Sequence, residues 1–239
     1  MKKITLKLTA FFMALIFSVG YGLIPSAAEE VLPVIPTDTA ALAGEAKSVI
    51  LIEAETGKVL YEYEADMRLA PASVTKIMTI LLVAEEIGKG TLKLTDIVQI
   101  SDNASHMGGS QVYLKAGEQM SVEDLLKSVI IASANDAATA LAEQVAGSVE
   151  GFVERMNARA SELGMSNTVF ENPTGLDDST VDHKTTARDI SLMSRELMKH
   201  EFILNYTTIW MDSIRNGAFG LTNTNRLIRF YNGANGLKT

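Results

Sequence analysis

The sequence predicts an α+β fold, in which a β-hairpin near the start is followed by a mostly helical chain. Residues 48–54 are largely apolar, the letters TGK at 56–58 form a turn, and residues 59–64 alternate in the way of a strand. Apolar residues then recur at helical spacing in five later stretches, at 76–87, 121–133, 136–145, 152–163 and 186–200. Such a domain needs further strands to complete its sheet, and we expect them beyond Thr239, where this sequence ends.

The first predicted helix is bounded by a proline and a glycine. Pro71 fits a helix entry, because the N–H group that proline lacks would have no helical partner there. Gly88 supplies a stop, and the helix is expected to end near the letters GKG at 88–90. The region that follows is mixed. Strand-like pieces are expected at 97–100 and 111–114, on either side of a polar loop at 101–110.

The later helices have clear start and stop signals. Ser121 followed by Asp124 resembles a capping box and starts a helix that runs into Ser133. The alanine-rich helix that follows ends at Gly147, and the next one is stopped by Gly164.

The N-terminus has the pattern of an export signal. Lysines near the start, an apolar run at 8–23 and the letters SAA at 26–28 predict a secretory signal peptide, residues 1–28. An uncleaved membrane anchor is the alternative, but the apolar run is short for a span and is interrupted by glycines. Residues 29–46, with two prolines among small side chains, are expected to form an extended leader.

Composition and charge exclude several classes of function. Removing residues 1–28 takes away three lysines and no acidic residue, which moves the formal net charge from −8 to −11. So acidic a chain argues against nucleic acid or an anionic membrane surface as a partner. Without cysteine, disulfides, thiolate catalysis and cysteine-bound zinc are excluded. Three histidines far apart in the sequence argue against a metal site or a Ser-His-Asp triad, and no cofactor is expected.

Ser73 and Lys76 form a Ser-x-x-Lys pair at the start of the first predicted helix. Residues three apart lie on one helix face, so the amine of Lys76 can lie beside the hydroxyl group of Ser73. The positive end of the helix dipole favours an alkoxide or oxyanion at this position. The pair is therefore either a nucleophile with its base or a capping serine beside a solvated lysine.

A serine–lysine hydrolase needs a second hydroxyl group to pass the proton to the leaving group. Two Ser-x-Asn sequences are candidates, one beginning at Ser101 and one formed by Ser133 and Asn135. The second lies in the break between two apolar helices, where a buried polar pair needs partners or a chemical role. We favour Ser133 and Asn135 over Ser101, with a helix end followed by a capping residue as the alternative.

The same hydrolase needs a cation to hold an anionic substrate, and two Lys-Thr pairs compete for this role. Lys184 directly precedes a predicted helix, which leaves no bare strand backbone beside it. Lys238 and Thr239 follow a glycine-containing stretch, 233–237, that permits close backbone approach to a ligand. We favour Lys238 with Thr239, and a surface lysine is the alternative.

Together the three motifs, Ser-x-x-Lys, Ser-x-Asn and Lys-Thr(-Gly), match the set found in class A β-lactamases and penicillin-binding proteins. Over residues 45–239 the chain resembles, more closely, the serine-type D-alanyl-D-alanine carboxypeptidases, the low-molecular-mass penicillin-binding proteins. The segments that carry this resemblance are APASVTKIMT at 70–79, MGGSQ at 107–111, ASANDA at 132–137, NPTGL at 172–176, NTNRL at 223–227 and GLKT at 236–239. The chain departs from the family at Ala134, where glycine is frequent, and the glycine expected after Thr239 lies beyond this sequence.

The resemblance implies the fold of DD-peptidases and β-lactamases, a sheet flanked by helices plus a helical subdomain. Residues 47–239 would be the catalytic domain, truncated at the Lys-Thr-Gly motif and with its sheet incomplete. Family members continue with further strands, usually a β-rich domain and an amphipathic anchor, so any membrane attachment is expected through a missing C-terminal anchor. Action at the outer face of the cytoplasmic membrane or in the cell wall is implied.

The resemblance also implies acyl transfer on peptidoglycan stem peptides that end in D-alanyl-D-alanine. Ser73 would attack the terminal peptide bond, neutral Lys76 would take its proton, and Ser133 would pass a proton to the leaving D-alanine. The implied substrate-binding residues are Asn135, Lys238 and Thr239.

β-Lactams would acylate Ser73 as covalent inhibitors, because they mimic the substrate. Two alternatives remain, a serine β-lactamase and a non-catalytic cell-wall-binding relative. A β-lactamase needs a carboxylate to activate water, and Glu171 lies in about the right region. The residues around Glu171 resemble the carboxypeptidase pattern, so we interpret it as structural. An intact Ser73 and Lys76 argue against a purely binding protein.

Overall fold

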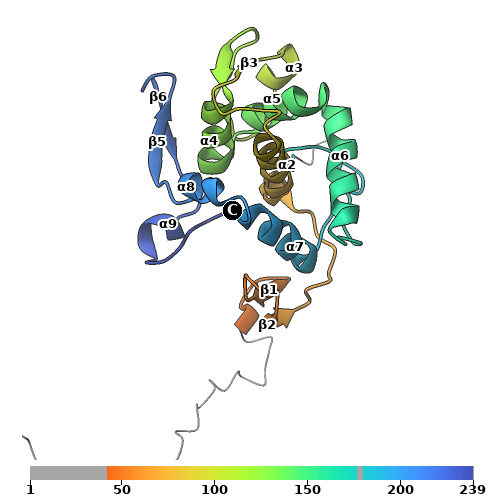
Figure 1. Cartoon of the computed structure of the whole chain (residues 1–239). Helices are drawn as coiled ribbons and strands as arrows, with labels where there is room; N and C mark the ends of the chain where they lie inside the picture. The colour runs from red at the N-terminus through yellow and green to blue at the C-terminus, as the bar shows by residue number, and fades with distance from the viewer. Residues whose placement is uncertain (1–41, 177–179, 239) are drawn as a thin grey trace, which may run out of the picture. The chain divides into compact units, whose positions relative to one another are not determined.

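The computed structural model describes residues 42–176 and 180–238, so the predicted signal peptide at 1–28 lies outside the described part. Of the expected leader, residues 42–46 are described; they make a short helical turn instead of an extended segment, because the N–H group of Ala46 donates to the carbonyl oxygen of Ala43. The predicted hairpin is confirmed. Strands β1 (Val49–Ile52) and β2 (Val59–Tyr63) pair antiparallel (Figure 1).

The first predicted helix is divided into two parts. A 3₁₀ turn, η1 (Ala72–Thr75), leads directly into helix α2 (Lys76–Lys89). The helix ends within the predicted stretch 88–90, although Gly88 itself stays helical and the stop is Gly90, whose φ of 76° reverses the chain. α2 is buried along most of its length and packs against α4, α5, α6 and α7 (Figure 1).

A second antiparallel strand pair packs against α4 and α5. The strand predicted at 111–114 is not part of it. β3 (Ile97–Gln99) pairs with β4 (Gln119–Ser121) and not with residues 111–114. Two N–H groups of 111–114 instead donate to the carboxylate of Asp136, at 3.0 to 3.2 Å, so they form no strand ladder. The polar loop at 101–110 contains a short helix, α3 (Asp102–Ser105).

The four later helices are confirmed, and side-chain caps explain where three of them begin. Ser121, Ser148 and Thr186 each accept a backbone N–H hydrogen bond in the first turn of their helices. The start of α5 has no such side-chain cap, because its N-cap residue is Ala134, whose methyl group cannot accept a hydrogen bond. These helices are α4 (Val122–Ala132), α5 (Asn135–Ala146), α6 (Val149–Glu162) and α7 (Ala187–Met198).

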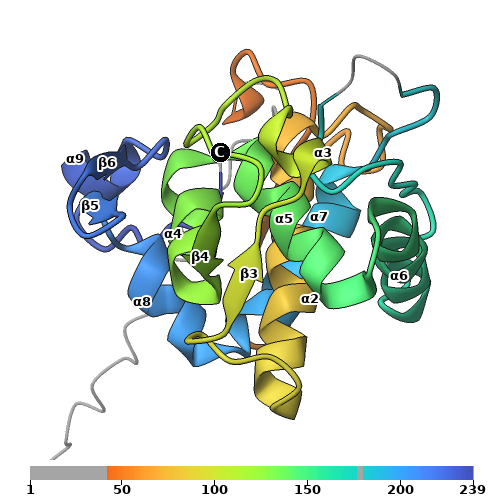
Figure 2. The ribbon, with the colours of Figure 1, turned by 90° about the horizontal axis from the view of Figure 1, so that it is seen from above.

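The last part of the described chain adds a third strand pair beside α4. β5 (Met211–Ile214) pairs with β6 (Phe219–Thr222), and the segment after β6 is attached to the end of α4 by the N–H group of Thr224, which donates to Ile131. Figure 2 shows β3 and β4 lying across α4 and α5, with β5 and β6 to one side. The short helical elements here are η2 (Glu201–Ile203), α8 (Leu204–Thr207) and α9 (Leu227–Phe230).

The described residues therefore form helices around a single apolar core, with three separate two-stranded sheets. The core lies mainly between α2, α4 and α5, whose inward side chains are almost completely buried. Such short sheets agree with the expectation that the main sheet is incomplete. Within residues 42–176 and 180–238, no helix is long and apolar enough to cross a membrane.

Candidate active site

Ser73 and Lys76 lie together at the junction of η1 and α2. The amine Nζ of Lys76 donates a hydrogen bond to Oγ of Ser73 at 3.1 Å, as the Ser-x-x-Lys spacing predicts. Ser73 belongs to the 3₁₀ turn and not to the first α-helical turn, which begins with Lys76 itself. Ala72, directly before Ser73, has a φ of 45°, a left-handed conformation that side chains rarely adopt and that is frequent at functional sites.

The surroundings of Lys76 favour its neutral form. The side chain is completely buried, and Nζ also donates to the carbonyl oxygen of Thr174 at 2.7 Å. Burial, followed by the positive charge of Lys238, lowers the pKa of Lys76 from 10.5 to about 7. A lysine with this pKa is neutral in an appreciable fraction at physiological pH, so it can accept the proton of the adjacent serine.

Lys238 is brought into the electrostatic neighbourhood of Lys76 by the end of the described chain. The segment before it is attached to α8, because the hydroxyl group of Thr207 donates to the carbonyl oxygen of Asn235 at 2.6 Å. Burial lowers the pKa of Lys238 to about 8. Thr239, its predicted partner in substrate binding, lies outside the described residues.

The competing lysine, Lys184, is used differently. Its backbone N–H and C=O groups both bond to Val169, and its amine lies 3.8 Å from the carboxylate of Asp182. The backbone beside Lys184 is therefore not bare, in agreement with the sequence argument that preferred Lys238.

Ser133 and Asn135 occupy the turn between α4 and α5. Ser133 adopts a left-handed conformation with a φ of 60°, and its buried hydroxyl group finds no hydrogen-bond partner among the described residues. Asn135 is held by its backbone N–H, which donates to Ser110 at 2.7 Å, and by its side-chain amide, which donates to Gly108 at 2.8 Å. Its side-chain oxygen, Oδ1, is also buried without a partner in the described chain. Buried polar atoms are normally paired, so these two atoms are candidates for contacts with a substrate.

A small cavity of about 240 Å³ connects several of these groups. It is lined by Ala72, Ser73, Gly109, Ser110, Asn135, Thr174, Gly175 and Leu176. Ser73 and Asn135, which are 62 positions apart in the sequence, therefore face the same space. Ser133, Lys76 and Lys238 do not line this cavity, although Lys76 contacts Ser73 directly.

The motif analysis assigned no role to two residues of this cavity, Thr174 and Gly175. The backbone oxygen of Thr174 accepts the hydrogen bond of Lys76, and Gly175 has a φ of 80°. A Cβ atom on Gly175 would lie 1.7 Å from the carbonyl oxygen of Ala72, so only glycine allows this approach. The signal was present in the segment NPTGL, but nothing in its letters shows that it contacts the Ser73 turn.

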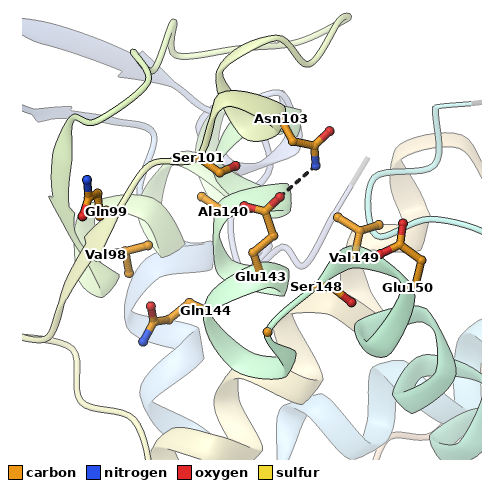
Figure 3. Close-up of a pocket in the computed structure, with 11 residues that line it drawn as sticks. Val98, Gln99, Ser101, Asn103, Ala140, Glu143, Gln144, Ser148, Val149 and Glu150 are labelled. Carbon is orange, nitrogen blue, oxygen red and sulfur yellow. Dashed lines mark hydrogen bonds between the residues drawn. The ribbon is translucent and has the colours of Figure 1, made fainter.

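The alternative Ser-x-Asn sequence, at Ser101, lies in a different groove. Figure 3 shows this groove, where Asn103 donates to the carboxylate of Glu143 at 2.8 Å. Ser101 caps α3 by accepting the N–H group of Ala104. The groove shares no residue with the cavity at Ser73, so Ser101 and Asn103 have structural roles.

Glu171 also has a structural role. One carboxylate oxygen accepts the N–H group of Val181 at 2.8 Å and the other accepts that of Asp182 at 2.7 Å. Both oxygens are therefore engaged in closing the loop between 171 and 182, which agrees with the structural interpretation of this residue.

Comparison with known proteins identifies the family. A family model described as D-alanyl-D-alanine carboxypeptidase matches residues 36–239. The D-alanyl-D-alanine carboxypeptidase DacF of Bacillus subtilis is 50% identical over 204 residues, which cover 84% of this chain and 52% of that protein. DacC of Escherichia coli, a D-alanyl-D-alanine carboxypeptidase, is 44% identical over 160 residues, covering 64% of this chain and 40% of that protein.

Solved structures agree with the predicted fold class. The D-alanyl-D-alanine carboxypeptidase DacD from Francisella tularensis superposes with a TM-score of 0.76 at 30% identity, covering 82% of this chain and 59% of that one. The α+β fold of DD-peptidases is thereby confirmed. The chain spans about half the length of the curated relatives that it matches. By its sequence match and its fold, this chain belongs to the D-alanyl-D-alanine carboxypeptidase family.

Proposed function

We propose that the whole protein is a serine D-alanyl-D-alanine carboxypeptidase that removes the terminal D-alanine from peptidoglycan stem peptides. One observation carries this proposal. Ser73 accepts a hydrogen bond from a completely buried lysine whose pKa is lowered to about 7, in the cavity that Asn135 also lines. A serine with an adjacent neutral amine is an activated nucleophile, and a binding protein has no use for one.

In this mechanism Ser73 attacks the carbonyl carbon of the terminal peptide bond while Lys76 takes its proton. The bond to the leaving D-alanine then breaks, and the hydroxyl group of Ser133 passes a proton to the departing amine. The product is an ester between the shortened peptide and Ser73, which water hydrolyses. Asn135, Lys238 and Thr239 would bind the substrate, with the cation of Lys238 attracting its terminal carboxylate.

The same chemistry makes β-lactams covalent inhibitors of this protein, since their strained amide would acylate Ser73. We infer that the ester would be cleared slowly, because Glu171 does not line the cavity at Ser73 and its carboxylate is bonded to backbone N–H groups of its own loop. The β-lactamase alternative is therefore not favoured. Export through residues 1–28 and action outside the cytoplasm, on the cell wall, follow from the same proposal.

The test uses the full-length protein, with fluorescent penicillin as the acylating reagent and D-alanine release from a pentapeptide as the readout of turnover. We expect stable labelling and D-alanine release, and both fall by on the order of 10⁴-fold in Ser73→Ala. Ser101→Ala is the matched control and should behave as the wild type. Labelling that survives in Ser73→Ala refutes the assignment of the nucleophile, and rapid hydrolysis of the penicillin indicates a β-lactamase.

A further inference from the structure

A buried histidine joins the two parts of the molecule that surround Lys76. Nε2 of His183 lies 2.8 Å from the hydroxyl oxygen of Thr75, the residue directly before Lys76. On the other side of the ring, Nδ1 accepts the backbone N–H group of Glu171 at 2.9 Å. His183 is 5% exposed, and none of the sequence motifs includes it.

These contacts determine the protonation of the ring. Because Nδ1 accepts a hydrogen bond, it carries no proton, and the proton of the neutral ring is on Nε2, which donates to Thr75. Burial lowers the pKa of His183, while the carboxylate of Glu171 acts in the opposite direction. The ring is therefore neutral at physiological pH, with one fixed tautomer.

The loop that His183 attaches is the one that supplies the partner of Lys76. Residues 171–175 place the carbonyl oxygen of Thr174 at 2.7 Å from Nζ of Lys76. One turn further along α2, the hydroxyl group of Thr79 donates to Pro173 in the same loop at 2.6 Å. The loop is thus hydrogen-bonded on both sides of the lysine, to Thr75 at the end of η1 through His183 and to Thr79 in α2 directly.

We propose that His183 is a positioning residue for the reaction, whose hydrogen bond to Thr75 holds the 171–175 loop against α2 and so keeps Lys76 dry and bonded to Thr174. This role rests on the proposed function, in which Lys76 is the base. His183 touches neither Ser73 nor the lysine amine in the described contacts, so it acts through Thr75 and the loop.

The consequence is a measurable change in the titration of the lysine. If the loop separates from α2, water reaches the amine, and the burial that lowers the pKa of Lys76 to about 7 is reduced. The pKa then rises toward 10.5, so a smaller fraction of the protein is active at a given pH. The charged groups that act on this network are Lys238, near Lys76, and Glu171, near His183.

The experiment measures the second-order rate of acylation by fluorescent penicillin between pH 5.5 and 9 in the full-length protein. In the wild type the rate should rise with pH through a midpoint near 7, where Lys76 loses its proton, and fall again around pH 8 as Lys238 loses the charge that attracts the carboxylate. The midpoint compared between variants is that of the rising limb. In His183→Ala we expect the midpoint to move up by about one pH unit and the rate at pH 7 to fall about fivefold. His200→Ala is the matched control for loss of a histidine and should leave both unchanged.

Two further variants separate positioning from general support of the fold. A glutamine can place an amide donor near the position of Nε2, so His183→Gln should retain most of the wild-type profile, whereas the shorter side chain in His183→Asn cannot reach Thr75. Thr75→Val should reproduce the shift, and combining it with His183→Ala should add nothing further, because both remove the same hydrogen bond. If His183→Ala does not fold, Thr75→Val carries the test.

An unshifted midpoint in both His183→Ala and Thr75→Val overturns the inference. The inference is also overturned if His183→Gln and His183→Asn lose the same acylation rate without a shift in the midpoint, since this indicates a role in the fold alone. The proposed function would survive either result, because the wild type would still be labelled at Ser73. A wild type that takes no label refutes the proposed function and this inference together.

Discussion

Two adjacent side chains at the start of α5, Asn135 and Asp136, are both buried but are paired very differently. The carboxylate of Asp136 accepts backbone N–H groups from Val112, Leu114 and Ala137. The oxygen of the Asn135 side chain has no partner within the described chain. Both carboxylate oxygens of Asp136 are thus engaged, whereas Asn135, which lines the cavity at Ser73, keeps a side-chain oxygen without a partner in the described chain.

The same difference in hydrogen bonding is seen between Ser128, inside α4, and Ser133, in the turn that follows α4. The buried hydroxyl group of Ser128 donates to the carbonyl oxygen of Asp124 within α4. Near the cavity, the hydroxyl group of Ser133 has no partner among the described residues, and the amine of Lys76 is buried with a lowered pKa. Unfavourable burial near the cavity is tolerated because satisfied groups such as Asp136 hold its wall in place.

Among substitutions at these buried polar groups, Lys76→Met is expected to have the largest effect on the rate of acylation. Acylation should fall by on the order of 10³-fold, because the base is lost. In the wild type the pKa of Lys76 is about 7 when folded and 10.5 in its unperturbed state, so the unfolded chain binds more protons between these values and stability rises with pH. From pH 7 to 9 the unfolding free energy should rise by about 2 to 3 kcal/mol more in the wild type than in the variant.

Chemical denaturation of both proteins at pH 7, 8 and 9 measures this difference. If the unfolding free energies of the two proteins change with pH in parallel, the lysine is already solvated in the folded protein, which contradicts its burial.

A smaller effect, on stability alone, is expected from Asp136→Ala. Three backbone N–H groups lose their acceptor in a buried site, so the unfolding free energy should fall by about 3 kcal/mol. Glu143→Ala on the same helix is the control, because Glu143 bonds Asn103 at the surface groove (Figure 3), and it should change stability by no more than about 0.5 kcal/mol. Urea titration measures the unfolding free energy of both variants. If Asp136→Ala loses no more stability than Glu143→Ala, the backbone N–H groups bonded to Asp136 do not depend on it.

The smallest stability effect, with a clear effect on activity, is expected from Ser133→Ala. Removing an unpaired buried hydroxyl group should leave the unfolding free energy unchanged or raise it by up to about 1 kcal/mol. Acylation should fall about 100-fold if Ser133 relays the proton. Ser128→Ala is the reverse control, since it should lower stability by about 1 kcal/mol and leave acylation unchanged. A variant of Ser133 that is destabilised but fully active would show that the residue is structural.

Elements whose formation depends on local pattern were predictable. The hairpin of β1 and β2 and the helices α4 to α7 follow from alternation, helical spacing and capping residues. The strand expected at 111–114 was wrong because its N–H groups bond a side chain 22 or more positions away, at Asp136, and a local pattern does not register such a competitor. The end of α2 within 88–90 was predicted, but the stop is Gly90 and not Gly88, because a glycine ends a helix only where the chain needs a left-handed residue.

The sequence by itself determined the Ser73–Lys76 pair, because three residues of helical rise bring the two side chains to one face whatever surrounds them. It also preferred Ser133 over Ser101 and Lys238 over Lys184. Tertiary structure alone decided the surroundings that favour a neutral lysine. The lowered pKa of Lys76 comes from burial and a cation 162 positions away, and its hydrogen-bond acceptor Thr174 lies in a distant loop. Burial and long-range charge depend on how distant segments pack, which no local pattern encodes.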